Sequence, residues 1–543
     1  MTLKRVDYII VGGGSAGCVL AARLSEDVSV HVLLLEAGDD ERRYFRIRVP
    51  LAWRDAFRDP RLSWGFETDP EPYADQRRVP APRGKVLGGS NSVNGLMYMR
   101  GCPADYDDWA GRGLPAWDYA GVLPYFRRSE SNWRGASRFH GGTGPLTTAR
   151  YETDDSIYPR VIEAAEALGF KHLEDFHAED IEGFSVPDCN YHGGERASTV
   201  ARYLRPAMSR PNLEVRINTL VHGLLFENGR CVGVRAESDG KPEEFRCERE
   251  VILSAGTFNS PQLLQLSGIG APADLEPHGI RVRHDLPGVG ANLQDHQSLS
   301  IDFAASGDFC FDSQLRLDRL ALSVLQWKMF RNGILARSPI SAQGLVRTRA
   351  DLDRPDLQML VAPTSIFARP WFPGWRRGMG HTIANSCVLL HPESRGKVSL
   401  RSADPRAKPR IQLNLLQAEA DRVGLRSIVR FVRRFFATAP ATELVGRELS
   451  PGVEVDDDAT IDGWVRANVR TAMHPTSTCA MGNDRHSVVD GQLRVHGLSG
   501  LRIADASIMP AIVGGNTNAP TIMIAEKAVD LILGRGQRGG ERT

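Results

Sequence analysis

Residues 7–17 read DYIIVGGGSAG, and this stretch decides the fold of the first part of the chain. Residues 7–11 form a short apolar run rich in β-branched side chains, which predicts a buried parallel strand. Apolar residues then recur at helical spacing across residues 16–24, and residues 31–35 form a second apolar run that ends on Glu36. The segment therefore predicts a strand, a helix and a second parallel strand, with G-x-G-x-x-G at the first turn.

Each glycine of this motif has a distinct expected role. Gly12 allows the tight turn, Gly14 lets the backbone approach a pyrophosphate, and Gly17 lets the helix pack closely on the strand. Glu36 follows Gly17 by about 20 residues, where a carboxylate accepts hydrogen bonds from ribose hydroxyls. We therefore predict a dinucleotide site rather than a plain structural turn. The acid argues against NADP, but the motif alone does not separate FAD from NAD.

Composition excludes several other classes of function. The 543 residues carry 67 Lys and Arg against 66 Asp and Glu, and a net charge of +1 gives no electrostatic footprint for nucleic acid. The eight cysteines are scattered without a C-x-x-C pair, so we expect no metal site, no disulfide framework and a reducing, cytoplasmic location. No apolar stretch reaches the roughly 20 residues of a membrane span. The length favours two domains.

Five further segments carry recognisable patterns: residues 82–101, 250–270, 288–296, 473–482 and 501–532. Residues 82–101 form a polar, glycine-rich loop. Residues 501–532 combine a strand ending on an acid with a glycine turn and an apolar helix. In residues 250–270 a strand leads into a glycine. Ser260 and Pro261 favour a helix start, and Gly268 favours the end of that helix. Residues 473–482 contain one histidine directly before a proline.

Together these segments resemble the glucose–methanol–choline (GMC) oxidoreductase family over residues 7–533, most closely its bacterial choline- and alcohol-dehydrogenase-type members. The resemblance implies an α/β protein, α+β overall, in which a doubly wound, Rossmann-like FAD-binding domain joins a substrate domain built on an antiparallel sheet and helices. We expect residues 1–300 to form the N-terminal FAD-binding part, with some substrate-domain segments near 151–199. Residues 301–469 would form mainly the substrate domain, and residues 470–537 would complete the FAD domain and the active site.

The resemblance implies that the chain oxidises a small-molecule alcohol to an aldehyde or ketone, with hydride transfer to flavin N5. It places His474 as the base, and an ordinary histidine pKa near 6.5 suits that role at neutral pH. The second active-site residue of the family is His or Asn. Asn518 matches it, and its amide would donate to the oxygen as alkoxide character develops. A structural hydrogen bond for His474 and a helix cap for Asn518 are the alternative roles.

The resemblance also implies an FAD site. Asp505 is expected near the ribityl-phosphate region, and Val221 beside the adenine through its backbone. Some choline-oxidising members attach FAD through a histidine whose position is occupied here by Val93, so we expect non-covalent FAD. The expected cofactor-binding residues are Gly12, Gly14, Ser15, Ala16, Gly17, Glu36, Ala37, Val86, Gly88, Ser90, Asn94, Gly95, Leu96, Met97, Val221, Asp505, Ala506, Asn516 and Thr517.

Several alternatives stay open at this point. A lyase or photodecarboxylase on the same scaffold, or a non-catalytic flavoprotein, competes with alcohol oxidation, although the pair of His474 and Asn518 favours oxidation. Oxygen, a quinone or another carrier would accept the electrons. Residues 421–436 form a basic amphipathic helix that we expect to pack on the protein rather than on a membrane. Residues 367–380 form a lid, an interface patch or an ordinary loop. A homo-oligomer and weak peripheral membrane attachment remain open, and residues 300–390 show no pocket pattern.

Overall fold

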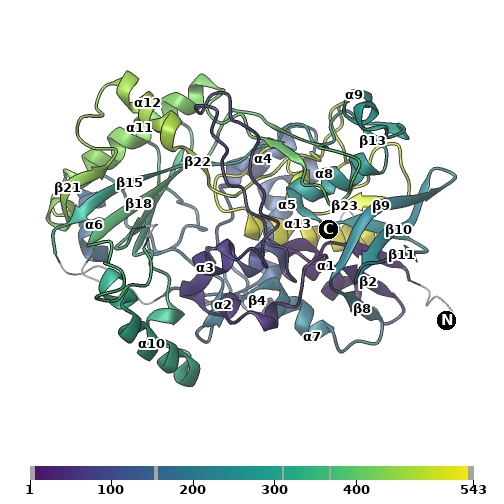
Figure 1. Ribbon diagram of the computed structural model, residues 1–543, viewed down its shortest axis with the longest axis horizontal. Helices are drawn as coiled ribbons and strands as arrows, with labels where there is room; N and C mark the ends of the chain where they lie inside the picture. Colours follow the sequence, from purple (N-terminus) through teal and green to yellow (C-terminus); the bar gives the residue numbers. More distant parts are fainter. Residues whose placement is uncertain (1–5, 152–156, 308–310, 366–367, 536–543) are drawn as a thin grey trace.

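The first layer of the molecule is a five-stranded parallel sheet (Figure 1). The computed structural model describes residues 6–151, 157–307, 311–365 and 368–535. The strand order is β23-β12-β1-β2-β8. The strands are β1 (Tyr8–Val11), β2 (Val32–Leu35), β8 (Leu213–Arg216), β12 (Glu250–Leu253) and β23 (Leu501–Ile503). The central strand β1 pairs with β2 and β12, so the sheet is assembled from segments far apart in the sequence.

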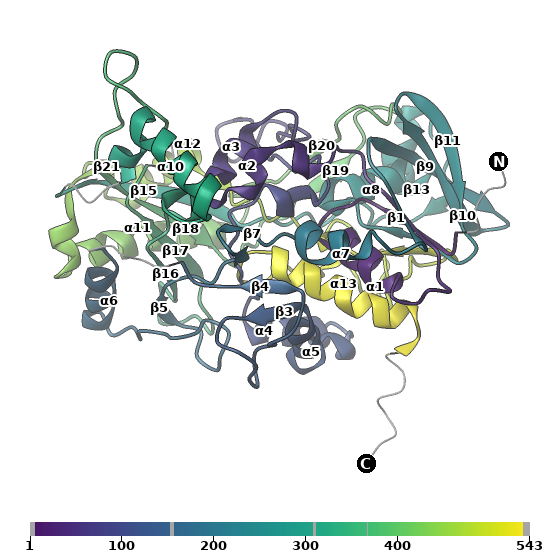
Figure 2. The same cartoon turned by 90° about the horizontal axis from the view of Figure 1, so that it is seen from below.

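The predicted strand–helix–strand unit is confirmed. Helix α1 (Ser15–Leu24) begins directly after the glycine turn, and every residue of β1 and β2 is buried. Helix α1 packs against the C-terminal helix α13 (Asn518–Ile532), which also packs against α5 (Tyr119–Ser129). Figure 2 shows α1 and α13 side by side below the sheet. The two ends of the chain therefore build one core.

A three-stranded antiparallel sheet covers the other side of this layer. It consists of β9 (Thr219–Glu227), β10 (Arg230–Ser238) and β11 (Lys241–Arg246) in the order β11-β10-β9. Strand β10 packs near β12, and β9 packs against α8 (Gly256–Leu266). The parallel sheet is thus covered on both faces, as its continuous apolar strands require.

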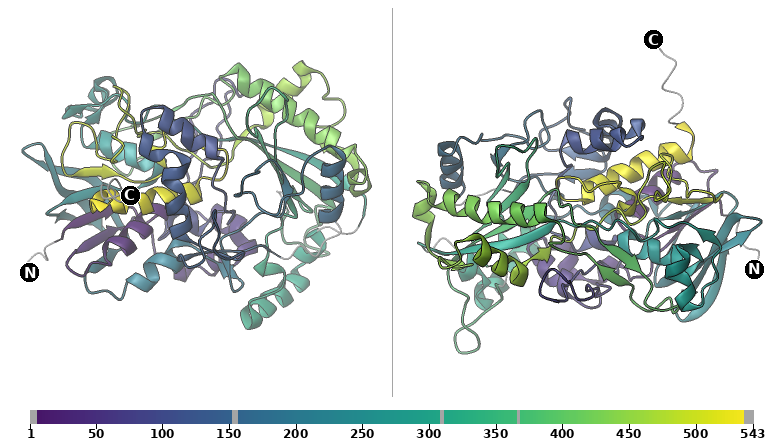
Figure 3. Two further views of the ribbon diagram at one scale, coloured as in Figure 1. Left: turned by 180° about the vertical axis from the view of Figure 1, so that it is seen from behind. Right: turned by 90° about the horizontal axis from the view of Figure 1, so that it is seen from above.

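The second layer is a seven-stranded antiparallel sheet with the order β21-β15-β18-β17-β16-β5, in which β22 pairs with β15. Helices α6 (Ile157–Ala167), α11 (Glu419–Phe436) and α12 (Asp458–Asn468) lie on this half of the molecule (Figure 3). Its core is separate from the first and contains apolar side chains of the sheet and of α11. The strands are β5 (Gly183–Ser185), β15 (Gln297–Ala305), β16 (Ala342–Val346), β17 (Leu357–Ala362), β18 (Thr382–Leu389), β21 (Val445–Ser450) and β22 (Arg470–Thr471).

Helix α8 begins earlier than expected. We predicted a start at Ser260–Pro261, but α8 begins at Gly256 and contains Pro261 in its interior. Proline lacks the N–H that would bond the carbonyl four residues earlier. That carbonyl belongs to Thr257, and it accepts a hydrogen bond from Thr478 Oγ1 at 2.6 Å instead. The tertiary contact removes the penalty that made Pro261 look like a helix boundary.

Helix α11 packs on the protein, as expected. Its apolar stripe, including Leu425, Ile428 and Phe435, is buried. Four of its arginines form ion pairs, among them Arg426 with Asp458 at 2.9 Å. No helix in the described part of the chain is long and apolar enough to cross a membrane.

Candidate active site

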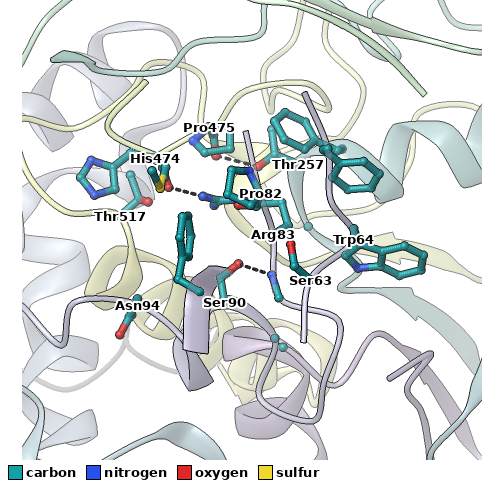
Figure 4. Close-up of a pocket in the computed structure, with 18 of the residues that line it drawn as sticks. Ser63, Trp64, Pro82, Arg83, Ser90, Asn94, Thr257, His474, Pro475 and Thr517 are labelled. Atoms are coloured by element: carbon teal, nitrogen blue, oxygen red, sulfur yellow. Dashed lines mark hydrogen bonds between the residues drawn. The ribbon is translucent and has the colours of Figure 1, made fainter. Parts of the chain in front are cut away.

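A cavity of about 1180 Å³ lies where the two layers meet. Its walls come from the glycine motif, from the loop of residues 82–97, from strands β17 and β18, and from the segments around residues 473 and 516. Figure 4 shows residues of the loop 82–97 and of the segments around residues 473 and 516 grouped around a common space. The cavity therefore brings together the motifs that the sequence distributes over 500 residues.

The glycine motif forms a concave stretch of backbone, called here the cradle, in which each glycine has a different structural role. A Cβ on Gly17 would lie 1.9 Å from the Gly12 carbonyl oxygen, so α1 can approach β1 only with glycine here. A Cβ on Gly14 would meet nothing nearer than 4.0 Å, so the space in front of Gly14 is open and belongs to the cavity. Gly88 N donates to Gly13 O at 2.6 Å and ties the second glycine-rich loop to the first.

Glu36 is held at the end of β2 by two backbone donors. Its Oε2 accepts from Gly13 N at 2.8 Å and its Oε1 accepts from Gly38 N at 2.7 Å. The side chain is buried yet lines the cavity, and burial raises the pKa of Glu36 to about 7. An ionised carboxylate has about four acceptor positions, so two remain for ribose hydroxyls.

Two helices point their N-termini at the cavity. Ser15 and Ala16 open α1, while Asn516 and Thr517 precede α13, and all four residues line the space. Helix N-termini carry partial positive charge and free N–H groups, which stabilise phosphate or an anionic ring system. Together with the open face of Gly14 and the carboxylate of Glu36, these residues fit an FAD.

Most of the expected cofactor-binding residues line the cavity, but Gly17, Val86 and Gly88 do not. Gly17 and Gly88 shape the backbone of the cradle, and Val86 packs in a small apolar cluster. Asp505 lines the cavity and also binds the start of α8, where its Oδ2 accepts from Gly256 N at 2.9 Å. Its carboxylate is thus partly committed to structure.

His474 is positioned by a clamp on its backbone. Its N–H donates to Asp295 Oδ1 at 2.8 Å, and Thr471 Oγ1 donates to the other carboxylate oxygen. The next residue, Pro475, offers its carbonyl to Thr257 Oγ1 at 2.7 Å (Figure 4). These contacts join the loop to the segment before β15 and to α8, so the imidazole enters the cavity from a rigid support.

The neutral form of His474 is strongly favoured. Desolvation, His296 and the Arg83 guanidinium hold the pKa of His474 well below its ordinary 6.5. Its Nε2 lies 3.0 Å from Asn516 Nδ2, and its Nδ1 lies 3.0 Å from His296 Nδ1. An amide nitrogen is only a donor, so Nε2 must carry the lone pair. The proton of His474 then lies on Nδ1, where it donates to His296.

The orientation of the Asn516 amide is set by a chain of buried amides. Its Oδ1 accepts from Gln358 Nε2 at 3.1 Å, and the same Nε2 donates to Gln343 Oε1 at 3.1 Å. Gln343 Nε2 in turn contacts Met99 Sδ at 3.2 Å. Because Oδ1 is engaged by a donor, Nδ2 is the atom that faces His474. Strands β16 and β17 of the second sheet thereby fix which atom meets the imidazole.

Asp105 anchors the segment that carries Asn516. Its Oδ2 accepts from Gly514 N at 2.7 Å, and its Oδ1 contacts His391 Nε2 at 2.9 Å. Cys102 lies close enough to these two side chains for all three to share a cation. The carboxylate is already engaged by the Gly514 N–H, by the Cys102 N–H and by His391, so this group serves to hold the loop.

The two asparagines near the start of α13 have different side-chain partners. Asn516, expected among the cofactor-binding residues, lies beside His474. Asn518, expected as the catalytic partner, is the first residue of α13, and its Oδ1 accepts from Ser15 Oγ at 2.8 Å. The Asn518 side chain thus joins the starts of α13 and α1.

Sequence reasoning missed three parts of the site. Arg83 and His296 lie in two of the five patterned segments, residues 82–101 and 288–296, but neither residue was itself predicted to act at the site. The third is the wall from β17 and β18, where alternate residues line the cavity, which is the period-two signature of one strand face. These residues are Gln358, Leu360, Ala362, Ala384, Ser386 and Val388.

The sequence matches the description "GMC oxidoreductase" over residues 6–298 and again over residues 392–525. An oxygen-dependent choline dehydrogenase of Photobacterium profundum is 41% identical over 97% of this chain and 93% of its own length. The mitochondrial choline dehydrogenase of Mus musculus is 40% identical over 97% and 89%. Among solved structures, a formate oxidase variant of Aspergillus oryzae has a TM-score of 0.91 at 28% identity, covering 98% of this chain and 99% of that one.

The environment of Glu36 predicts a pH-dependent affinity for FAD. The ionised carboxylate accepts ribose hydroxyls best, and burial raises its pKa to about 7, so the affinity of the apoprotein for FAD should fall as the pH drops below about 7. In Glu36→Gln, FAD binding should be weaker at pH 8 and should lose this dependence. Flavin fluorescence quenching on titrating apoprotein with FAD measures both. Equal pH dependence in the variant would remove Glu36 from the ribose site.

Proposed function

The chain belongs to the GMC oxidoreductase family and is an FAD-dependent oxidoreductase of alcohols; we propose that His474 and Asn516 are its reacting pair and that its substrate is an uncharged alcohol. The single observation that carries the assignment of the pair is the 3.0 Å contact between His474 Nε2 and Asn516 Nδ2 inside the cavity. A lyase or photodecarboxylase does not require a neutral imidazole paired with an amide donor beside the substrate space, so oxidation is favoured.

The proton and the hydride of the alcohol leave to different acceptors. When bound, FAD would supply flavin N5 as the hydride acceptor. His474 Nε2 accepts the hydroxyl proton, because its neutral form dominates at neutral pH and the alcohol hydroxyl replaces the Asn516 N–H at its lone pair on binding. Asn516 Nδ2 donates to the alcohol oxygen as negative charge develops there. Gln358 keeps the amide in the donating orientation throughout.

We assign this donor role to Asn516 in place of Asn518. The Asn518 carbonyl oxygen is occupied by Ser15, and its Nδ2 reaches only Asn190 Oδ1 at 3.5 Å. Both asparagines line the cavity, so they differ in which partner the side-chain amide faces rather than in whether it reaches the cavity.

The charge of the cavity argues for an uncharged alcohol. A quaternary ammonium is bound by carboxylates or over aromatic faces. Aromatic rings do line the cavity, but two of them, Trp53 and Trp64, already have Arg54 Cζ and Lys85 Nζ over them at 5.3 and 4.8 Å from the ring centroids, so the balance of charge decides the preference. Among the described residues, the acids that line the cavity are Glu36, Asp505 and Glu67. The first two bind backbone N–H groups, and Glu67 is exposed and lies 3.8 Å from Arg78. No carboxylate therefore faces the space beside His474.

Two arginines reinforce this preference. Arg83 donates to the carbonyls of Pro82 and Met473, and Arg54 donates to the carbonyl of Ser365. Desolvation lowers the pKa of each arginine to about 10, which leaves both cationic at neutral pH. Their charges repel a cationic substrate, while Leu360, Ala362 and Val388 offer apolar contact.

We further propose that the FAD is not covalently attached. Val93 stands where a histidine would attach the flavin, and its side chain packs with Ile47, Ala56, Leu62 and Val86. A valine has no nucleophilic atom. After acid precipitation of the purified holoprotein, all flavin absorbance should stay in the supernatant; yellow protein in the pellet would contradict this proposal.

Variants of the three side chains separate their roles. His474→Ala should lower the anaerobic rate of flavin reduction by about 10²–10⁴-fold, because a positioned base is lost. Asn516→Ala should lower it by about 10²–10³-fold, since one donor to the developing alkoxide is removed. Asn518→Ala is the matched control and should change the rate less than about tenfold, while costing roughly 1 kcal/mol of stability.

Stopped-flow absorbance of the flavin, after FAD content has been checked in each variant, gives these rates. An Asn518→Ala enzyme slower than Asn516→Ala would reverse the assignment. A His474→Ala enzyme that reduces its flavin at the parent rate would remove His474 as the base.

The substrate proposal is tested by an isosteric pair. Choline and 3,3-dimethylbutan-1-ol have nearly the same shape, but only choline carries a charge. We expect the uncharged alcohol to reduce the flavin with kcat/KM at least about tenfold higher, a difference of ~1.4 kcal/mol. Faster reduction by choline would overturn the substrate class without affecting the assignment of His474. Oxygen, which the bacterial relatives' name specifies, is the acceptor to try first for turnover.

A further inference from the structure

Helix α10 (Leu317–Phe330) is apolar on the side that faces solvent. Its inner side packs on the protein through Trp327, which is fully buried and donates to Gly194 O at 2.7 Å. On its outer side Leu322 is 69% exposed, Leu325 is 55% exposed and Met329 is 63% exposed. A surface helix of a globular protein normally turns polar side chains outward. Packing within the chain therefore does not explain why these outer side chains of α10 are apolar.

A neighbouring loop extends the same surface. Leu317 N donates to Trp371 O at 2.9 Å, which joins the start of α10 to residues 368–380. The loop exposes Phe372, Trp375 and Met379, and Trp375 is 60% exposed. Figure 2 shows α10 and the green loop after β17 projecting from one end of the molecule. We call residues 316–330 and 368–380 together the projecting end.

The projecting end is also strongly basic. It holds one acid, Asp318, which pairs with Arg316 at 2.7 Å. Its formal charge is +5, whereas the whole chain has a net charge of only +1. The basic residues are Arg316, Arg319, Lys328, Arg369, Arg376 and Arg377.

We propose that the projecting end docks on the surface of an anionic lipid bilayer. Leucine, methionine, phenylalanine and tryptophan side chains enter the boundary between headgroups and acyl chains, and the arginines and Lys328 meet the lipid phosphates. Charge decides against a second copy of the chain as the occupant, because a two-fold contact through this surface would bring two ends of charge +5 together. The apolar stripe of α11 is buried and takes no part.

Docking through this surface would place the substrate cavity close to the bilayer, and its value for catalysis rests on the proposed function. Trp327 of α10 packs edge-on against Phe45 with ring centroids 5.2 Å apart. Phe45 opens the short helix α2 (Phe45–Arg48), and the adjacent helix α3 (Trp53–Arg58) lines the cavity. The cavity wall therefore lies near the bilayer, from which an apolar alcohol can enter.

Sedimentation of the holoprotein with vesicles tests the proposal. We expect binding to vesicles that contain phosphatidylglycerol, weaker binding to pure phosphatidylcholine, and a decline with salt above about 0.1 M as charges are screened. The double variant Arg376→Gln and Arg377→Gln should bind phosphatidylglycerol vesicles about 30-fold less tightly, the effect of two basic residues at such a surface. The matched control is Arg447→Gln with Arg485→Gln, two exposed arginines elsewhere that should leave binding unchanged.

The apolar part is tested separately. Leu325→Ser with Trp375→Ser should abolish binding, whereas Val28→Ser with Val453→Ser, exposed valines outside the projecting end, should not. Absence of vesicle binding by the parent, or equal binding by the variants and their controls, overturns the proposal. A dimer of the parent that the Leu325 and Trp375 variant loses also overturns it, in favour of a second copy. Flavin reduction by a soluble alcohol without vesicles should be unchanged in all four variants, so failure here is distinct from failure of the proposed function.

Discussion

The hydrogen bond between His474 Nε2 and Asn516 Nδ2 is the interaction on which the rest of the site depends. Because the amide nitrogen can only donate, it forces the imidazole to present its lone pair at Nε2 and its proton at Nδ1. His296 receives that proton's hydrogen bond, and desolvation keeps His296 neutral by lowering its pKa to about 3. The site is therefore prepared to accept a proton before any alcohol arrives.

This arrangement explains why the fold brings distant segments together. His474 comes from the loop after β22, Asn516 from the segment before α13, and Gln358 from the second sheet. Each is rigid for a different reason: a carboxylate clamp at Asp295, an anchor at Asp105, and a strand position in β17. The parallel sheet supplies the FAD cradle, and the antiparallel sheet supplies both the substrate wall and the orientation of the donor.

The sequence predicted the parts of this site that depend on local patterns. The glycine motif and Glu36 stand in a short segment with strong spacing rules, and the family resemblance pointed to His474. Gly12, Gly14, Glu36 and His474 all line the cavity. Asn516 and Asn518 could not be separated, because they lie two residues apart at a helix start and only the partners Gln358 and Ser15 decide their directions. The start of α8 was mispredicted for a related reason, since Thr478, more than 200 residues away, satisfies the carbonyl that Pro261 leaves free. Long-range partners of this kind leave no periodic trace in a sequence.

The claim that His474 is held neutral is tested most directly by the rate of anaerobic flavin reduction as a function of pH, measured on holoprotein with a saturating uncharged alcohol. Protonation removes the Nε2 lone pair, so the rate falls only as the pH drops through the pKa of His474, which lies well below 6.5. The account predicts a constant rate per bound FAD from pH 8 down to pH 6.5, with the FAD content measured at each pH. A rate that declines through an apparent pKa at or above the ordinary histidine value would contradict it.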